Sequence, residues 1–126
     1  MVDLVQEALR LQDFLQGRDW RFCFIGGLAV QHWGEPRLTR DLDVSLFVGF
    51  HNEAAFVDEL LRRYAARMQD ARTFALSRRV LLLRSAGGIG IDISLAALPY
   101  EEGAIRRSVL IEMLPGALIR LCSRKI

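Results

Sequence analysis

Hydrophobic and polar positions repeat along this chain with two different periods, and each period predicts a different kind of element. Apolar side chains recur every three to four positions in residues 3–16, which is the pattern of an amphipathic helix. Further helices are predicted at 28–34, 53–68 and 100–107, with a short helical turn that Asp70 caps and that runs through Arg78.

Strands are predicted where apolar runs are short or alternate with polar residues. In 41–48, Leu42, Val44, Leu46 and Val48 face one way while Asp41, Asp43 and Ser45 face the other; 89–96 alternates in the same manner, with Asp92 on its polar side. The remaining predicted strands are 20–25, 80–84, 108–114 and 117–122. Helices and strands are interspersed, which predicts an α/β (α+β) fold with a mixed sheet flanked by helices.

Length and composition indicate a single globular domain over residues 1–126. A chain of this length buries roughly two-thirds of its unfolded surface, enough for a core without disulfides. With 52% hydrophobic and 25% charged residues, disorder is excluded, and no apolar run approaches the ~18 residues of a membrane span. Two isolated cysteines and the lack of a signal sequence predict a cytoplasmic protein with buried free thiols.

The net charge of +2 is too small for a protein that coats nucleic acid. Lys125 is the only lysine among 17 basic residues, so the positive charge is carried almost entirely by arginine. Genome composition explains such a bias, and so does bidentate binding of phosphates by some of the arginines. Composition does not decide between the two.

Three aspartates carry the chemistry that the sequence suggests. Asp41 and Asp43 are two positions apart on a predicted strand, so their carboxylates project from one face. Two neighbouring negative charges on a buried face need a cation, and an oxygen-only ligand set favours Mg²⁺ or Mn²⁺. Asp92, on the polar side of a second strand, completes a predicted metal cluster. The alternative is that these are solvated carboxylates on an exposed strand.

A glycine pair lies upstream of the acids. Gly26-Gly27 ends one predicted strand and begins a helix, where bare backbone N–H groups and the positive helix end can hold phosphate oxygens. Glycine permits this approach because a side chain would keep the phosphate away from the backbone. Most such pairs are simple turns, and the pair gains meaning only from the acids that follow it.

The order of these parts is Gly26-Gly27, thirteen residues, Asp41-x-Asp43, and then Asp92 on a later strand. This arrangement resembles the nucleotidyltransferase superfamily that includes DNA polymerase beta. The segment FIGGLAVQHWGEPRLTRDLDVSL looks most like AbiEii-like toxin nucleotidyltransferases and their bacterial relatives, and RVLLLRSAGGIGIDISLAALPYE continues the similarity. The resemblance covers about residues 1 to 124 and implies a nucleotidyltransferase fold.

The resemblance also implies roles for individual residues. Gly26 and Gly27 would contact the triphosphate, and polar residues beside the phosphates would be Arg37, Thr39 and Arg40, whose alternative is a solvated loop. Asp41 and Asp43 would hold the metals, and Asp92 would complete the cluster and orient or deprotonate the attacking hydroxyl. The implied reaction transfers a nucleoside monophosphate from a nucleoside triphosphate to an acceptor hydroxyl, with Mg²⁺ or Mn²⁺ as cofactor.

The acceptor and the partners are less defined. The resemblance suggests RNA, especially tRNA, in a toxin–antitoxin setting, while a protein side chain or an antibiotic stays open as acceptor. Related proteins continue past the dipeptide matching Cys122-Ser123 into a helical region that binds nucleotide and acceptor, so we expect this region to be missing here. The apolar C-terminal edge is then expected to dock on an antitoxin or on a second copy. The competing function is a nucleotide- or metal-binding remnant that acts through protein interaction; a hydrolase using the same acids is a weaker alternative.

Overall fold

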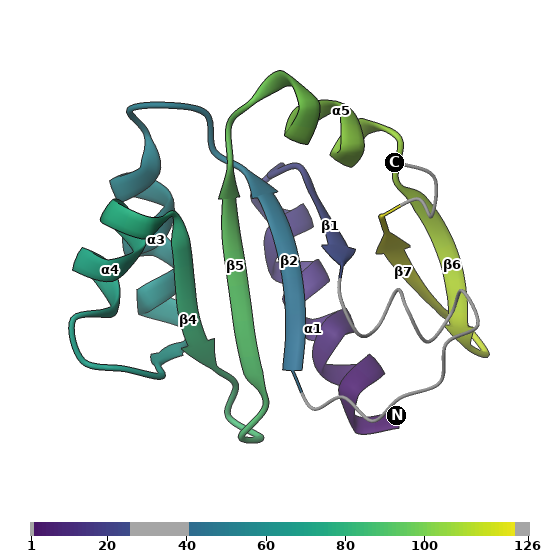
Figure 1. Ribbon diagram of the computed structural model, residues 1–126. Helices are drawn as coiled ribbons and strands as arrows, with labels where there is room; N and C mark the ends of the chain where they lie inside the picture. The colour runs from purple at the N-terminus through teal and green to yellow at the C-terminus, as the bar shows by residue number, and fades with distance from the viewer. Residues whose placement is uncertain (1, 26–40, 123–126) are drawn as a thin grey trace.

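A seven-stranded mixed sheet organises residues 2–25 and 41–122, the part of the chain that the computed structural model describes (Figure 1). The strand order is β3-β4-β5-β2-β1-β7-β6. The elements are α1 (Val2–Gly17), β1 (Phe22–Ile25), β2 (Asp41–Phe47), α3 (Glu53–Arg63), β3 (Ala65–Ala66), α4 (Ala71–Arg78), β4 (Val80–Arg84), β5 (Gly90–Ala96), α5 (Pro99–Arg106), β6 (Val109–Leu114) and β7 (Ala117–Leu121). The α/β (α+β) prediction of a mixed sheet flanked by helices is confirmed.

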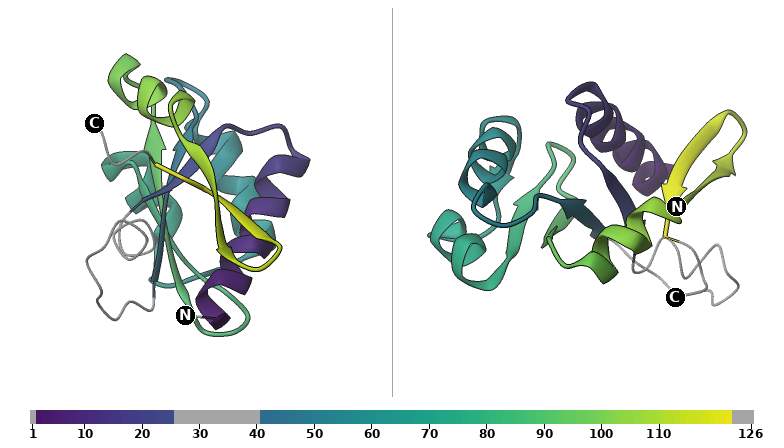
Figure 2. Two further views of the ribbon diagram at one scale, coloured as in Figure 1. Left: turned by 90° about the vertical axis from the view of Figure 1, so that its right-hand side faces the viewer. Right: turned by 90° about the horizontal axis from the view of Figure 1, so that it is seen from above.

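One face of the sheet carries the main hydrophobic core. Alternation in β2 and β5 directs their apolar residues to the face that α1 and α3 cover, as the view from above shows (Figure 2). The largest side chains that are fully buried include Phe24, Leu11, Leu15, Leu42, Leu46, Leu60, Ile91 and Ile93. The amphipathic stripe predicted for residues 3–16 therefore packs as expected.

The opposite face is covered only in part by the described residues. There α5 packs over the ends of β1, β2 and β5, where a small cluster contains Cys23, Ala96 and Ile105 (Figure 2). Ile25, Phe47 and Cys122 pack against this cluster. The polar positions of β2 and β5 lie on this same face, because their side chains alternate with those of the core.

The predicted helix 53–68 is wrong at its C-terminal end. The helix α3 ends at Arg63, and Tyr64 adopts an extended conformation. Ala65 and Ala66 then pair antiparallel with Arg84 and Leu83 as the short edge strand β3. Alanine is a strong helix former, so local preference predicted a longer helix, but pairing with the open edge of β4 outweighs that preference.

Asp70 also differs from its predicted role. It occupies the position before α4 but has a left-handed backbone, with φ of 56°, and its side chain makes no capping hydrogen bond. The helix predicted over 28–34 lies outside the described residues and stays a prediction.

The C-terminal hairpin is attached to the sheet by few strand contacts. Strands β6 and β7 flank a turn at Gly116, whose φ of 79° suits glycine, while β7 meets β1 at one register pair, Phe24 with Leu121. The buried side chain of Gln12 on α1 supplies further contacts: its Nε2 donates to the carbonyl of Leu118 at 2.7 Å, and its Oε1 accepts from the backbone N–H of Arg120 at 2.9 Å. Helix α1 thus holds the hairpin through backbone groups of β7.

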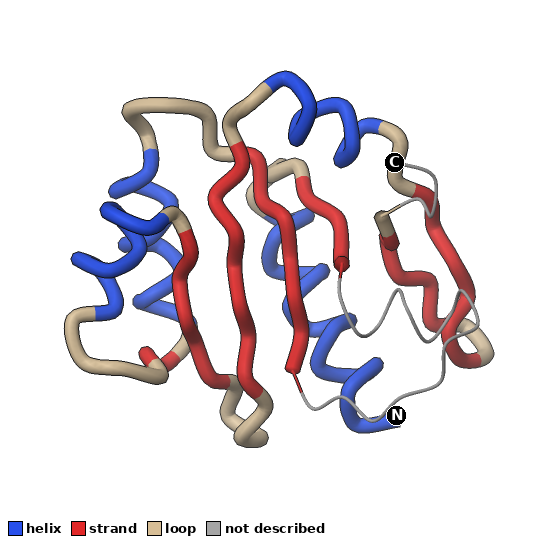
Figure 3. The backbone as a smooth tube through the Cα atoms, in the orientation of Figure 1, coloured by secondary structure: helices blue, strands red, loops and turns tan. Residues whose placement is uncertain are grey.

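Strand β6 forms one edge of the described sheet, as the tube view illustrates (Figure 3). Val109 and Leu110 on this strand, and Leu118 on β7, are 40 to 50% exposed. An apolar edge was predicted for this region, and docking of a partner on it stays a prediction. None of the helices described in residues 2–25 and 41–122 has the length and apolarity that crossing a membrane requires.

Both cysteines are free thiols, as predicted, but only Cys23 is buried; Cys122 is partly exposed. Burial raises the pKa of the Cys23 thiol to about 12, and the neighbouring Cys122 adds to the effect. Cys23 is therefore an uncharged side chain of the small cluster at neutral pH.

Arg79 ties the loop before α3 to the end of β5. Its Nη1 donates to Glu53 Oε2 at 2.5 Å, its Nε donates to the carbonyl of Leu95 at 3.1 Å, and its Nη2 donates to the carbonyl of Gly49 at 3.2 Å. The hydrogen bond from Arg79 holds the pKa of Glu53 below its ordinary value of 4.5. Arg79 is therefore a structural residue that joins these two segments.

We predict that Arg79→Gln lowers stability at pH 7 and that its deficit shrinks in acid. Because the pKa of Glu53 is lowered by folding, its contribution is present above about 4.5 and is lost as the pH falls through the lowered value. Urea denaturation at pH 7 and pH 3 measures this difference. Glu53→Gln serves as the control, since it should show the same loss of pH dependence. A deficit of Arg79→Gln that is equal at both pH values would contradict the assignment.

Candidate functional site

The three predicted acids lie on the same face of two adjacent strands. Strands β2 and β5 lie side by side and run parallel (Figure 1). Their register sets Asp41 opposite Gly90 and Asp43 opposite Asp92. Register partners on neighbouring strands project to the same side, and the strands lie about 4.8 Å apart. The structure therefore brings the carboxylates of Asp43 and Asp92 together, with Asp41 two positions before Asp43 on the same face.

The electrostatics of Asp43 reflect this crowding. Partial burial, with the nearby carboxylates of Asp92 and then Asp41, raises the pKa of Asp43 from 3.8 to about 6. A protonated Asp43 also donates a hydrogen bond to Asp92, which stabilises the neutral form, and Arg67 opposes the shift. The ionised form of Asp43 is thus less stable than that of an ordinary aspartate, and a cation beside it would relieve the cost.

A cation does lie beside the neighbouring carboxylate, and it is a side chain. Arg67 follows strand β3, and its Nη2 forms an ion pair with Asp92 Oδ1. Its Nη1 donates to the carbonyl of Leu83 at 3.1 Å, and its backbone N–H donates to the carbonyl of Leu82 at 3.0 Å. The side chains of Arg67 and Asp92 are 23% and 31% exposed, so the ion pair is partly buried and still accessible to solvent.

Gly90 provides the space in which these groups meet. A Cβ atom at this position would lie 2.7 Å from Asp41 Oδ1 and in contact with Nη1 of Arg67. Because Gly90 pairs with Asp41 on the face of the acids, its missing side chain leaves room for a carboxylate and a guanidinium together. Glycine is needed at this position because the two side chains approach its Cα closely, and not because the backbone conformation requires it.

The three aspartates fit a hard divalent cation by ligand type and charge. Carboxylate oxygens favour Mg²⁺ or Mn²⁺, and a cation would stabilise the ionised form of Asp43. Their side-chain positions are not those of a metal centre, because within residues 2–25 and 41–122 no three Asp, Glu, His or Cys side chains are placed so that they could hold an ion. The metal cluster of Asp41, Asp43 and Asp92 stays a prediction.

The predicted phosphate-binding residues lie outside the described part of the chain. These are Gly26, Gly27, Arg37, Thr39 and Arg40. The end of β1 at Ile25 and the start of β2 at Asp41 bracket them, and Ile25 is the register partner of Asp43. Their role as nucleotide ligands stays a prediction.

Sequence reasoning missed Arg67 and Gly90. Arg67 lies within the predicted helix 53–68, and a charged residue in such a helix is expected to be exposed to solvent. Only the pairing of Ala65 and Ala66 with β4 carries Arg67 toward β5. Gly90 carried a signal, since a glycine on the polar side of an alternating strand indicates close approach of another group.

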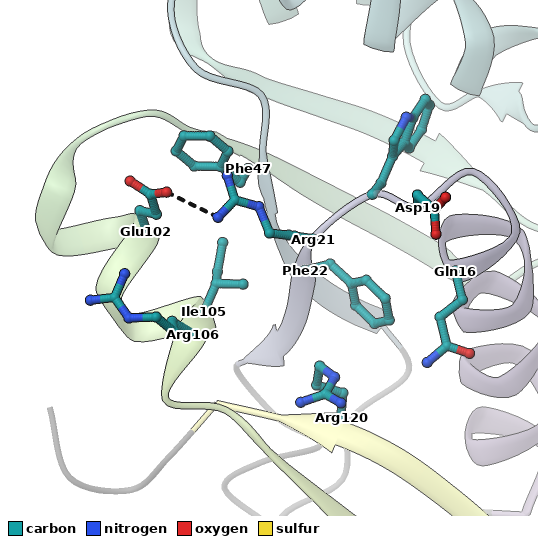
Figure 4. Close-up of a pocket in the computed structure, with 10 residues that line it drawn as sticks. Gln16, Asp19, Arg21, Phe22, Phe47, Glu102, Ile105, Arg106 and Arg120 are labelled. Atoms are coloured by element: carbon teal, nitrogen blue, oxygen red, sulfur yellow. Dashed lines mark hydrogen bonds and ion pairs between the residues drawn. The ribbon is translucent and has the colours of Figure 1, made fainter.

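A separate cavity of about 460 Å³ lies near α5 (Figure 4). Its residues are Gln16, Asp19, Trp20, Arg21, Phe22, Phe47, Glu102, Ile105, Arg106 and Arg120. Arg21 donates to Glu102 at 2.9 Å and its guanidinium lies 4.4 Å from the Phe47 ring centroid, so this arginine already has partners. None of the three predicted acids lines the cavity, so it is distinct from the site that they form.

The fold is similar to that of an antigenic nucleotidyltransferase-like protein from Paracoccidioides brasiliensis, known from a crystal structure. The TM-score is 0.56 at 16% sequence identity, and the match covers 95% of this chain and 60% of that protein. The chain thus spans about three-fifths of the length of this structural neighbour. Identity at this level defines the fold alone, which is nucleotidyltransferase-like.

No protein-family model matches the sequence, and no curated protein sequence matches it. The finer resemblance to AbiEii-like toxins stays a prediction.

Proposed function

We propose that this protein is a metal-dependent nucleotidyltransferase that moves a nucleoside monophosphate from a nucleoside triphosphate to an acceptor hydroxyl. The observation that carries the proposal is the register of Asp43 with Asp92 on adjacent parallel strands, with Asp41 on the same face. The nucleotidyltransferase-like fold supports the same reaction class.

In this reaction the acceptor oxygen forms a bond to the α-phosphorus while the bond to pyrophosphate breaks. Asp92 orients the acceptor hydroxyl and takes its proton. Asp41 and Asp43 would provide the negative charge that holds the cation, and Gly26-Gly27 would bind the triphosphate through backbone N–H groups. Mg²⁺ or Mn²⁺ held by the three acids would neutralise charge on the phosphates and lower the pKa of the hydroxyl.

The acceptor that we propose is RNA, in particular tRNA, in a toxin–antitoxin pair. The proposed acceptor rests on the similarity of residues 24–46 to AbiEii-like toxins and on the proposed use of a nucleoside triphosphate by the three aspartates. A protein side chain or an antibiotic is the alternative acceptor, and labelling of a mixed extract distinguishes them by the size and nuclease sensitivity of the product.

A second candidate function is a nucleotide- or metal-binding protein without transfer activity. The ion pair between Arg67 and Asp92 favours it, because a guanidinium then satisfies one of the three acids. In that case the protein acts through contacts with a partner, and no extract component becomes labelled.

We predict that the wild-type protein binds a nucleoside triphosphate in the presence of Mg²⁺ and that Asp41→Asn with Asp43→Asn abolishes this binding. Asparagine keeps the shape of each side chain and removes the charge that attracts the cation. Isothermal titration with each of the four ribonucleoside triphosphates measures the affinity. Incubation with α-labelled triphosphates and cell extract then tests transfer.

Asp13→Asn is the matched control, because Asp13 is an exposed aspartate on α1, away from the sheet face of the acids. Equal binding by wild type and by the double variant would contradict the proposed function. Binding that depends on Asp41 and Asp43 without labelling of any acceptor would support the binding protein instead, and release of free monophosphate in water alone would indicate a hydrolase.

A further inference from the structure

We propose that Arg67 is a built-in counter-ion of the acidic site, which competes with a divalent cation for Asp92 and must leave this carboxylate before the cation binds there. This inference deepens the proposed function and rests on it. It assigns a regulatory role to a residue that does not belong to the predicted ligand set.

The contacts of Arg67 support this role because its hydrogen bonds to strand β4 hold it at the site independently of Asp92. The backbone of Arg67 is fixed against β4 by the hydrogen bond to Leu82, and Nη1 is fixed by the carbonyl of Leu83. These two contacts aim Nη2 at Asp92 Oδ1. A guanidinium is protonated at all physiological pH values, so the charge that faces Asp92 is permanent.

The space for this arrangement is provided by Gly90. Its bare Cα lets the guanidinium and the Asp41 carboxylate approach the same point of the sheet. Arg67 therefore lies close to two of the three acids, Asp92 through the ion pair and Asp41 across the bare Cα of Gly90. One side chain thus supplies part of the positive charge that the acidic face needs.

Competition follows from the shared oxygen. The Oδ1 atom of Asp92 that pairs with Arg67 is one of the two oxygens that this residue can offer a metal. A divalent ion and a guanidinium at the same carboxylate also repel each other, because both are positive. An opposite charge within a few ångströms typically changes the affinity of a carboxylate for a cation such as the proton by about tenfold or more.

The guanidinium can move without unfolding the sheet. Strand β3 is two residues long and lies at the end of the strand order, and the ion pair is partly exposed. Release of Nη2 from Asp92 requires a side-chain rotation that also gives up the Nη1 bond to Leu83, and it leaves the backbone bond to Leu82 in place. The acidic face can therefore exchange one cation for the other.

The test is Mn²⁺ binding to metal-free protein at pH 7, measured from the electron paramagnetic resonance signal of free Mn²⁺ without nucleotide. Arg67→Gln is expected to bind Mn²⁺ about tenfold more tightly than wild type. Arg72→Gln is the matched control, since Arg72 forms a comparable ion pair with Asp58 at 2.7 Å on the exposed surface, and its affinity should equal that of wild type. Arg67→Met, which keeps the length of the side chain, gives a second variant should Arg67→Gln fold poorly.

The outcomes separate this inference from the proposed function. If Arg67→Gln and Arg67→Met gain affinity, and Asp92→Asn in the Arg67→Gln background removes the gain, Arg67 competes for that carboxylate. Equal affinities of wild type and both Arg67 variants, all lost on Asp43→Asn, would overturn the competition while leaving the metal site intact. Absence of Asp43-dependent Mn²⁺ binding in every variant would overturn the metal-dependent function and this inference together.

Discussion

Asp43→Asn is expected to stabilise the metal-free protein at pH 7 by about 1–3 kcal/mol. Folding raises the pKa of Asp43 from 3.8 to about 6, because the side chain is partly buried beside two other carboxylates. At about 1.4 kcal/mol per pKa unit this corresponds to at most ~3 kcal/mol, and partial exposure lowers the figure. Asparagine removes the charge and can still donate a hydrogen bond to Asp92.

The pH dependence of this effect has a defined sign. Below pH 3.8 Asp43 is protonated in both states, so wild type and variant should be equally stable. Between pH 3.8 and 6 the unfolded chain ionises while the folded protein keeps its proton, and wild-type stability falls relative to the variant. Above pH 6 the difference is constant. Urea denaturation in EDTA between pH 3 and 8 measures it, and Asp13→Asn should show no such trend.

The same substitution is expected to lower the proposed nucleotidyl transfer by more than ~100-fold, since substitution of even the hydrogen-bond partners of metal ligands typically costs about 10- to 100-fold. Both results together would support the proposed active site. Its like charges destabilise the folded protein when no cation is bound, and the same charges are needed for activity when the cation is present. A variant that is less stable than wild type at pH 7 would contradict the crowding of carboxylates described above.

Phe24→Ala is expected to destabilise the protein by about 3–5 kcal/mol, which corresponds to roughly 12–20 °C in Tm for a domain of this size. Phe24 is fully buried and lies edge to face with Phe22, with ring centroids 6.0 Å apart. It lies on β1, the strand that joins β2 to the C-terminal hairpin, so a cavity here weakens both connections.

Thermal and urea denaturation measure this loss. Leu118→Ala on β7 is the control, because its side chain is half exposed and its truncation should cost well under 1 kcal/mol. A Phe24→Ala variant as stable as the control would show that β1 does not join the two parts of the sheet through its core face.

Much of this architecture is predictable from local patterns. The alternation in residues 41–48 and 89–96 correctly separated the core face from the face of Asp43 and Asp92, because a strand places every second residue on the same side. The turn at Gly116 and the helix near Pro99 also follow from residue types whose conformational preferences are strong.

Other features depend on contacts between distant segments. Ala65 and Ala66 have the preferences of a helix, and only an available edge on β4 makes them a strand, so Arg67 could not be placed from its neighbours in sequence. The register that sets Asp43 against Asp92 is likewise fixed by packing across the sheet. The two patterns predicted that both acids face one way and left open how far apart they lie.

The side-chain amide of Gln12 has a mechanical consequence for the C-terminal hairpin. Its two hydrogen bonds reach β7 directly from α1, whereas the route through β1 passes one register pair. A displacement of the first helix is therefore passed directly to β7 and, through that strand, to β6. Because the same helix also packs on the core face of β2, it connects the C-terminal hairpin with a strand that carries two of the aspartates.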